Sequence, residues 1–235
     1  MSRKIVVVTG ASKGLGKAMA LQFAKDGNLL LLCSRNEAHL QSAAAEITHQ
    51  YPQSQVEICS ADVSDKAETL KFANWCLQFG VTDILINNAG QFLPGSVYNE
   101  EDGTIEKMIE TNLYSVYHLT RALLPKMMHK KNGHIFNICS TASLAAYANG
   151  GSYGISKFAL LGFNKNLREE LKPYNIKVTA VFPGAAYTDS WIGSGIDEKR
   201  MMQADDVAKM VYAASQLSMQ ACVEEILLRP QLGDL

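Results

Sequence analysis

The chain has 235 residues, of which 47% are hydrophobic and 19% are charged. This composition can bury one sizeable core, and we expect a single domain over residues 1–235. The formal net charge is −1 and no long run of lysine or arginine occurs, so neither nucleic acid nor a membrane surface is an expected partner. No apolar run approaches the roughly 20 residues of a membrane helix, and the four aliphatic residues before Thr9 are too few for a secretory signal.

The cysteines and histidines indicate neither disulfides nor a metal site. The five cysteines are an odd number without C-x-x-C spacing, and four of them lie in or beside apolar runs. They are typical of reduced core residues in a cytoplasmic protein. The five histidines show no ligand spacing such as H-E-x-x-H, so we expect no metal.

Short apolar runs alternate with helical patterns along the whole chain. Strands are expected at 4–9, 28–33, 55–61, 83–87, 133–139, 176–182 and 223–229. Helices are expected near 14–26, 36–50, 64–79, 101–130, 151–172 and 204–218. Runs 5–8 and 29–33 are almost wholly aliphatic or cysteine, which favours strands covered on both faces.

This alternation predicts an α/β fold, a single-domain Rossmann-type doubly wound parallel sheet of about seven strands with helices on both faces. The helix at 101–130 is expected to run without a break, because its apolar residues keep a spacing of three or four. Ser64 with Asp65 is expected to cap the helix at 64–79. The stretch 184–203 shows no strand or clear helix, which is typical of a mobile lid or a binding loop.

The first strand is followed by a glycine-rich turn, TGASKGLG, at residues 9–16. Glycines between a strand and a helix let backbone N–H groups and the positive end of the helix approach a pyrophosphate. A P-loop is excluded, because five residues separate Gly10 from Gly16 where that motif has four, and Ala18 stands where Ser or Thr should bind Mg²⁺. The alternative is a structural turn without a ligand.

Four further clusters fall where an expected strand ends. They are Asp62-Val63, Asn87-Asn88-Ala89-Gly90, Ser140 and Pro183-Gly184. In open parallel sheets, ligands bind outside the carboxyl ends of the strands. The sequence therefore predicts one ligand site at this edge of the sheet.

Over essentially its full length the chain resembles the short-chain dehydrogenase/reductase family. The residues that carry the resemblance are TGASKGLG at 9–16, Asp62, NNAG at 87–90, Asn112, Ser140, Tyr153-Gly154-Ile155-Ser156-Lys157, and Pro183-Gly184 with Thr188. The resemblance implies an NADP(H)- or NAD(H)-dependent oxidoreductase with catalytic residues Asn112, Ser140, Tyr153 and Lys157. It implies a cofactor site formed by Gly10, Ser12, Lys13, Gly14, Leu15, Gly16, Ser34, Arg35, Asp62, Val63, Asn88, Ala89, Gly90, Tyr153, Lys157, Pro183, Gly184 and Thr188.

The end of the second expected strand favours NADPH over NADH. Family members that use NAD usually carry an acid there, which holds the ribose 2′-hydroxyl. Here the sequence is Cys33-Ser34-Arg35, and Lys13 lies in the glycine turn. Both cations could meet a 2′-phosphate, which a carboxylate would repel.

Reduction of a carbonyl needs a hydride at carbon and a proton at oxygen, and the cofactor supplies only the hydride. Tyr153 is the expected proton donor, with Lys157 one helical turn on and expected to lower the tyrosine pKa. Ser140 is expected to donate a hydrogen bond to the carbonyl oxygen. By resemblance, Lys157 also holds the nicotinamide ribose, and Asn112 binds a water that links Lys157 to solvent.

Aromatic and apolar residues near the nicotinamide predict a flat or hydrophobic small-molecule carbonyl substrate. Phe92, Tyr147 and Trp191 are the expected substrate contacts, with Met201 and Met202 as further wall residues. The segments Tyr187–Trp191 and Glu224–Pro230 resemble bacterial sepiapterin-reductase-like members, which reduce a carbonyl on a pterin side chain.

Two alternatives stay open. One is a ketoreductase similar to 3-oxoacyl carrier-protein reductases, although the chain lacks the glycine pair that commonly ends them. The other is a non-catalytic module that senses NADP(H), which would not need Ser140, Tyr153 and Lys157 together. The family resemblance also implies a homodimer or homotetramer formed through the helices at 101–130 and 151–172.

Overall fold

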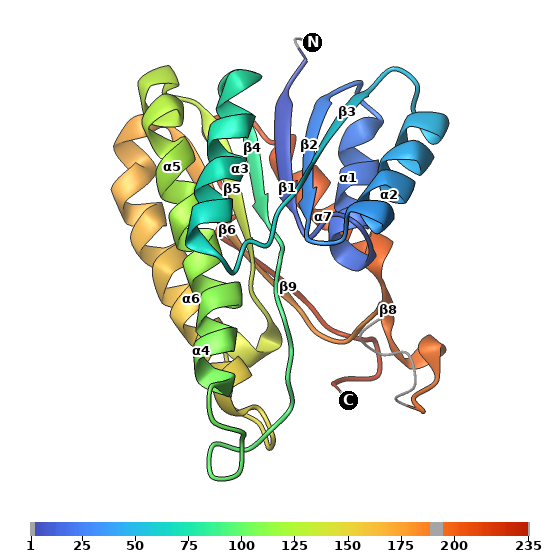
Figure 1. Cartoon of the computed structure of the whole chain (residues 1–235), viewed down its shortest axis with the longest axis vertical. Helices are drawn as coiled ribbons and strands as arrows, with labels where there is room; N and C mark the ends of the chain where they lie inside the picture. Colours follow the sequence, from blue (N-terminus) through green and yellow to red (C-terminus); the bar gives the residue numbers. More distant parts are fainter. Residues whose placement is uncertain (1–2, 189–194, 235) are drawn as a thin grey trace.

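The computed structural model describes residues 3–188 and 195–234. Within these residues, seven parallel strands form one sheet in the order β3-β2-β1-β4-β5-β6-β9 (Figure 1). The strands are β1 (Ile5–Thr9), β2 (Leu29–Ser34), β3 (Gln55–Ser60), β4 (Ile84–Asn87), β5 (Gly133–Ile138), β6 (Ile176–Pro183) and β9 (Glu225–Leu228). The order changes direction between β1 and β4, so the predicted doubly wound Rossmann-type fold is confirmed.

Helices cover both faces of the sheet (Figure 1). The first face carries α1 (Gly14–Ala24), α2 (Glu37–Gln50) and α7 (Ala204–Ser215). The second face carries α3 (Lys66–Gln78), α5 (Ser115–Lys130) and α6 (Gly151–Leu171). The short α4 (Thr104–Ile109) precedes α5.

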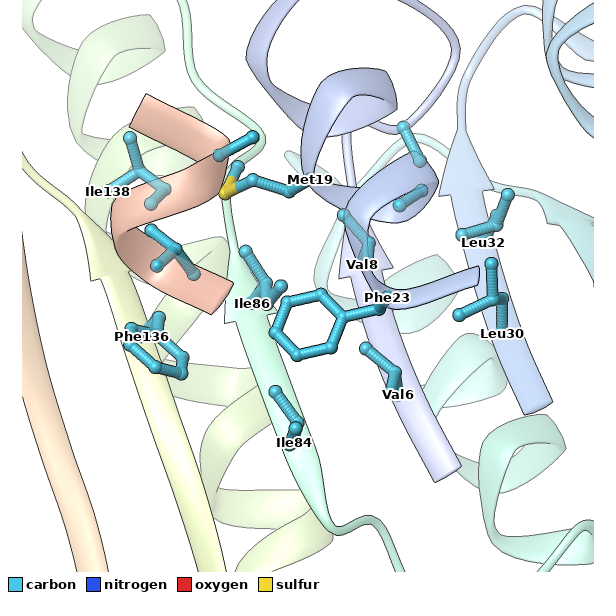
Figure 2. Packing of buried hydrophobic residues seen from close by; sticks show 14 of the residues in the cluster. Val6, Val8, Met19, Phe23, Leu30, Leu32, Ile84, Ile86, Phe136 and Ile138 are labelled. Atoms are coloured by element: carbon cyan, nitrogen blue, oxygen red, sulfur yellow. The ribbon is translucent and has the colours of Figure 1, made fainter. Parts of the chain in front are cut away.

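The central strand β1 shows why the strands are aliphatic throughout. Val6 and Val8 pack with Phe23 of α1 in the cluster on the first face (Figure 2), whereas Val7 belongs to the cluster with Phe72 of α3 on the second face. All three valines are fully buried. A polar residue at any of them would lose water on one face or the other.

The expected continuous helix at 101–130 is wrong in one respect, because a π-helix over Glu110–Tyr114 separates α4 from α5. The extra residue of a π-turn interrupts the regular hydrogen bonding of an α-helix, and such turns are frequent at functional sites. Asn112 lies in this turn and is fully buried. Its apolar neighbours preserve the helical spacing, so the interruption is not visible in the hydrophobic pattern.

The stretch 184–203, expected to lack strands, contains two in its described parts, 184–188 and 195–203. The two-residue strands β7 (Ala186–Tyr187) and β8 (Met202–Gln203) pair in parallel, and a 3-10 helix covers Glu198–Arg200. Met201 is buried, and Met202 packs against the core on the first face of the sheet. Neither methionine is among the described residues that line the cavity of the next section, so the expectation that they form its wall is wrong.

Local signals set the start of α3. Asp65 caps this helix by accepting a hydrogen bond from the Glu68 backbone N–H at 2.8 Å, as expected. Ser64 instead donates to Asp62 Oδ1.

The five cysteine thiols are all free. In the two described ranges, no helix is long and apolar enough to cross a membrane, and no three His, Cys, Asp or Glu side chains gather as metal ligands would.

Candidate active site

A cavity of about 980 Å³ lies at the carboxyl ends of the strands. It brings together most of the residues predicted from the sequence. They are Gly10, Ser12, Lys13, Gly14, Leu15, Ser34, Arg35, Asp62, Val63, Asn88, Ala89, Gly90, Phe92, Ser140, Tyr147, Tyr153, Lys157, Pro183, Gly184 and Thr188. Gly16 and Asn112 lie behind the lining, and Trp191 lies outside the described residues.

Main-chain packing fixes the glycine turn. Gly10 and Gly14 have positive φ angles of 64° and 55°, which residues with side chains rarely adopt. A β-carbon on Gly16 would lie 2.2 Å from the Gly10 carbonyl oxygen. The turn therefore admits only glycine at these positions, and its backbone can come close to a ligand.

Asn88 and Thr9 lock the turn to the segment after β4. Asn88 Nδ2 donates to the carbonyl oxygens of Thr9 and Gly10 at 2.9 and 3.1 Å. Thr9 Oγ1 accepts from the backbone N–H groups of Asn88 and Ala89, both at 3.0 Å. The two motifs are thus one rigid unit.

The N-terminus of α1 gives this unit an end that can bind an anion. Among the described residues, no side chain caps this helix end, and its first turn contains no acid. Free N–H groups at a helix N-terminus attract a phosphate. The residues present therefore fit the pyrophosphate of a dinucleotide.

At the far end of the cavity, residues after β2 meet those after β3. Ser34 and Arg35 line this part, as predicted, and so do Asn36 and His39, which sequence reasoning missed. Asn36 caps α2 by accepting from the His39 N–H at 2.9 Å. The cap formed by Asn36 marks the start of α2, and this signal could have indicated that the first turn of the helix lines the cavity.

Ser140 and Tyr153 meet at the other end of the cavity. Ser140 Oγ accepts from the Ala142 N–H at 3.2 Å, which leaves its hydroxyl hydrogen for donation. That hydroxyl is hydrogen-bonded to Tyr153 and lowers its pKa, but the burial of the phenol outweighs this effect and raises the pKa of Tyr153. Lys157 is not among the groups that shift this pKa in the protein alone, so the expectation that it lowers the Tyr153 pKa stays a prediction.

Lys157 lies close to Tyr153 and is itself buried. Its Nζ lies 5.7 Å from the centre of the Tyr153 ring and donates to the Ile138 carbonyl oxygen at 2.9 Å. Burial lowers the pKa of Lys157 to about 8, because a charged ammonium is costly away from water. The amine is thus close to titrating near neutral pH.

Asn112 joins the π-turn to the site. Its Oδ1 accepts from the Gln91 N–H at 2.7 Å, while Nδ2 donates to the Gln91 carbonyl oxygen at 3.0 Å and to Ser156 Oγ at 2.9 Å. A β-carbon on Gly90 would lie 3.2 Å from Asn112 Oδ1 and 3.6 Å from Lys157 Nζ. Gly90 therefore leaves room for both side chains beside it.

Phe92 and Tyr147 form aromatic walls near Tyr153. The rings of Phe92 and Tyr153 meet edge to face with centres 4.9 Å apart. Tyr147 is half exposed, and burial followed by the proximity of Tyr153 raises its pKa to about 12. Both aromatic residues lie where a substrate would meet the proton donor.

Two further groups of residues line the cavity, and sequence reasoning missed the second of them. Small residues of the segment after β5 line the cavity, namely Thr141, Ala142, Ala145 and Ala146. Arg229 and Asp234, which follow β9 and form an ion pair, also line it. Arg229 ends the seventh expected strand. The carboxyl end of this strand lies at the same edge of the sheet as the ends of the other six strands, and this position was the available signal.

Comparisons with known proteins point to one family. The family model described as short chain dehydrogenase matches residues 4–199. The chain is 33% identical to the sepiapterin reductase of Chlorobaculum tepidum over 99% of this chain and 98% of that protein. It is 31% identical to an uncharacterized oxidoreductase of Staphylococcus epidermidis, with 98% of each chain covered.

Two solved structures add the same likeness in three dimensions. A metagenomic short-chain oxidoreductase in complex with NADP has a TM-score of 0.84 and 31% identity, with 97% of each chain covered. Actinorhodin polyketide ketoreductase with NADPH has a TM-score of 0.89 and 25% identity, with 99% of this chain and 98% of that chain covered. The chain belongs to the short-chain dehydrogenase family, so the resemblance seen in the sequence is confirmed.

Proposed function

We propose that this short-chain dehydrogenase reduces a small-molecule ketone to an alcohol with NADPH. The observation that carries the proposal is the meeting of Ser140, Tyr153 and Lys157 in one cavity with the glycine turn. Relatives in complex with NADP and NADPH support the choice of cofactor. An NADP(H) sensor without catalysis would not need this trio of residues.

NADPH, when bound, supplies the hydride that the carbonyl carbon accepts. Tyr153 donates its hydroxyl proton to the carbonyl oxygen, so that a neutral alcohol is formed. Ser140, whose hydroxyl hydrogen is available, donates a second hydrogen bond to that oxygen. Lys157 stabilises the phenolate that Tyr153 becomes and returns a proton to it, which its pKa of about 8 makes easy near neutral pH.

Asn112 acts behind Lys157. The resemblance assigns it a water that links Lys157 to solvent. Since both amide hydrogens of Asn112 are donated to protein atoms, such a water would be held by the carbonyl groups of the π-turn or by the remaining lone pair of Oδ1. The π-helix supports this role, because a π-turn leaves backbone carbonyls without their usual partners.

Lys13 and Arg35 are proposed to bind the 2′-phosphate. Both line the cavity, and the end of β2 carries no acid. The pyrophosphate would lie on the turn Gly10–Gly16 and the N-terminus of α1. Asp62, Val63 and the segment 88–90 would hold the adenosine, and Pro183, Gly184 and Thr188 the nicotinamide.

A pterin-like side-chain carbonyl is the proposed substrate. The similarity to a sepiapterin reductase and the aromatic walls Phe92 and Tyr147 support it. The test is steady-state oxidation of NADPH with sepiapterin and, in parallel, with an acetoacetyl thioester, since a ketoreductase is the second candidate favoured by the likeness to actinorhodin ketoreductase. Turnover of sepiapterin at the higher kcat/KM is expected. Turnover of the thioester alone would contradict the pterin assignment.

Exposed apolar residues support a homodimer or homotetramer. Tyr114, Ile155 and Phe158 are exposed on the outer side of the layer of α5 and α6. Leu161, by contrast, is buried in the protomer. Light scattering coupled to size-exclusion chromatography is expected to give a molecular mass of two or four times the 25.7 kDa of one chain.

A further inference from the structure

The helix that carries the catalytic tyrosine and lysine does not cap itself. Helix α6 begins at Gly151, its N-cap residue Gly150 offers no side chain, and its first turn contains no acid. The first N–H groups of a helix have no partner within the helix and need one elsewhere. Tyr153 lies in this first turn, so its position depends on how the turn is held.

Glu100, which lies between β4 and α4, supplies the missing cap. Its Oε1 accepts from the Ser152 backbone N–H at 2.7 Å, and its Oε2 accepts from the Ser152 hydroxyl. Ser152 is buried. A carboxylate is favoured at the positive N-terminal end of a helix.

The contact is built to fit Glu100 closely. A β-carbon on Gly151 would lie 1.9 Å from Glu100 Oε1, and one on Gly95 would lie 2.7 Å from Glu100 Cγ. Gly151 also has a φ of 22°, outside the usual range of residues with side chains. Two glycines therefore make room for one carboxylate.

Further hydrogen bonds near Glu100 join the two segments that form the aromatic wall. Gly95 N–H donates to the Asn149 carbonyl oxygen at 3.2 Å, and Ser96 Oγ donates to Asn149 Oδ1 at 2.8 Å. The first segment begins with Phe92, whose ring contacts Tyr153. The second begins after Ser140 and contains Tyr147. The segments that carry Phe92 and Tyr147 are therefore joined beside the Glu100 cap, and Glu100 itself holds the turn that carries Tyr153.

We propose that Glu100 is a positioning residue for the reaction: it anchors the first turn of α6 and thereby sets the Tyr153 hydroxyl against the substrate wall. The proposal rests on the proposed reductase function. Glu100 touches neither the cofactor cradle nor the reacting atoms. Its removal should therefore slow catalysis without weakening NADPH binding.

The experiment compares Glu100→Ala, Glu100→Gln and Ser152→Ala with the matched control Glu101→Gln, an exposed acid next in the sequence. The readouts are kcat with sepiapterin or the acetoacetyl thioester, whichever the wild type turns over faster, and NADPH affinity by fluorescence. For Glu100→Ala, we expect kcat to fall about 30-fold, because small misplacement of a catalytic group is costly, and the NADPH Kd to stay within about twofold. Glu100→Gln keeps one acceptor for the Ser152 N–H and should recover much of the rate.

Two readouts separate positioning from general damage. Amide hydrogen exchange should speed up over residues 151–154 in Glu100→Ala but not over the glycine turn 10–16. The pH at which kcat is half-maximal should also move in Glu100→Ala and remain unchanged in Glu101→Gln. If Glu100→Ala does not fold, Glu100→Gln and Ser152→Ala carry the same test with smaller expected losses of rate.

An unchanged kcat in the Glu100 and Ser152 variants would overturn the proposal, as would equal losses of kcat, NADPH affinity and thermal stability. Neither result would affect the proposed function. Failure of the proposed function is seen separately, as a Tyr153→Phe variant that keeps the wild-type rate.

Discussion

The two ends of the cavity are built in different ways. At the dinucleotide end, main chain forms the wall, and the turn at 10–16 is locked to Asn88 and Thr9 by hydrogen bonds of 2.9–3.1 Å. At the substrate end, side chains such as Phe92 and Tyr147 form the wall, and both remain about half exposed. The comparison teaches that cofactor binding depends on positions that tolerate almost no change, whereas substrate choice depends on positions that can change without disturbing the fold.

Lys157 is the residue at which the two ends meet, and its replacement should have the largest effect. Lys157→Met is expected to lower kcat by about 1,000-fold, since the tyrosine loses its proton partner. The same variant should be more stable than the wild type by about 1–3 kcal/mol at pH 7, because it removes a buried charge. Urea unfolding at several pH values measures the gain.

The pH dependence of that gain has a definite sign. The folded Lys157 has a pKa of about 8, against 10.5 for the unfolded chain. Below pH 8 both states hold the proton, and the cost of burying the charge is fully present. Between pH 8 and 10.5 the folded protein binds fewer protons than the unfolded chain, so wild-type stability rises relative to the variant. A gain that grows with pH in this window would contradict the assignment.

Gly16→Ala tests the rigid end. The new β-carbon would lie 2.2 Å from the Gly10 carbonyl oxygen, so the turn must move away from its pyrophosphate-binding shape. The NADPH Kd is expected to rise by about 100-fold, given several lost or lengthened hydrogen bonds to charged oxygens. In the control Gly162→Ala, nothing lies within 4 Å of the new carbon, and NADPH affinity measured by fluorescence should not change.

Arg35→Ala probes the proposed 2′-phosphate contact at the same end. Losing one charge-assisted hydrogen bond should weaken NADPH by about 30-fold and leave NADH affinity unchanged. Isothermal titration with each cofactor measures both values. The exposed Lys71→Ala on α3, on the other face of the sheet, is the control for net charge. Equal losses of affinity for NADPH and NADH would show that Arg35 does not bind the 2′-phosphate.

Phe92→Ala should have the smallest effect and should be confined to the substrate end. Removal of an aromatic ring from the wall is expected to raise the substrate KM about fivefold, with NADPH affinity unchanged. Steady-state kinetics measure the change, and Tyr98→Ala, an exposed aromatic residue outside the cavity lining, is the control. A loss of NADPH affinity in Phe92→Ala would mean that the two ends are not independent.

The sequence predicted the rigid end well because its signals are local. The positive φ angles of Gly10 and Gly14 belong to the turn itself, so the glycines indicate the turn without reference to distant residues. Polar residues at the strand ends likewise stand out against the apolar runs before them. The aliphatic runs of β1 and β2 likewise report burial on both faces. The sheet and its ligand edge follow from these two kinds of signal.

The sequence predicted less of the substrate end because its contacts join distant residues. Glu100 and Ser152 are 52 residues apart, and no pattern in the sequence pairs them. The π-turn around Asn112 preserves an ordinary hydrophobic spacing, so it too is set by tertiary contacts with Gln91 and Ser156. Met201 and Met202 look like pocket residues by composition, but Met201 is buried and Met202 packs against the core on the first face of the sheet.

The most direct test of the account is the rate of hydride transfer in the Tyr153→Phe variant. A single turnover of bound NADPH with sepiapterin, or with the acetoacetyl thioester if that is the faster substrate, is monitored by stopped-flow absorbance. The account predicts NADPH affinity within about twofold of the wild type and a hydride-transfer rate lower by about 1,000-fold, because the carbonyl oxygen loses its proton donor. Hydride transfer within tenfold of the wild-type rate would contradict it.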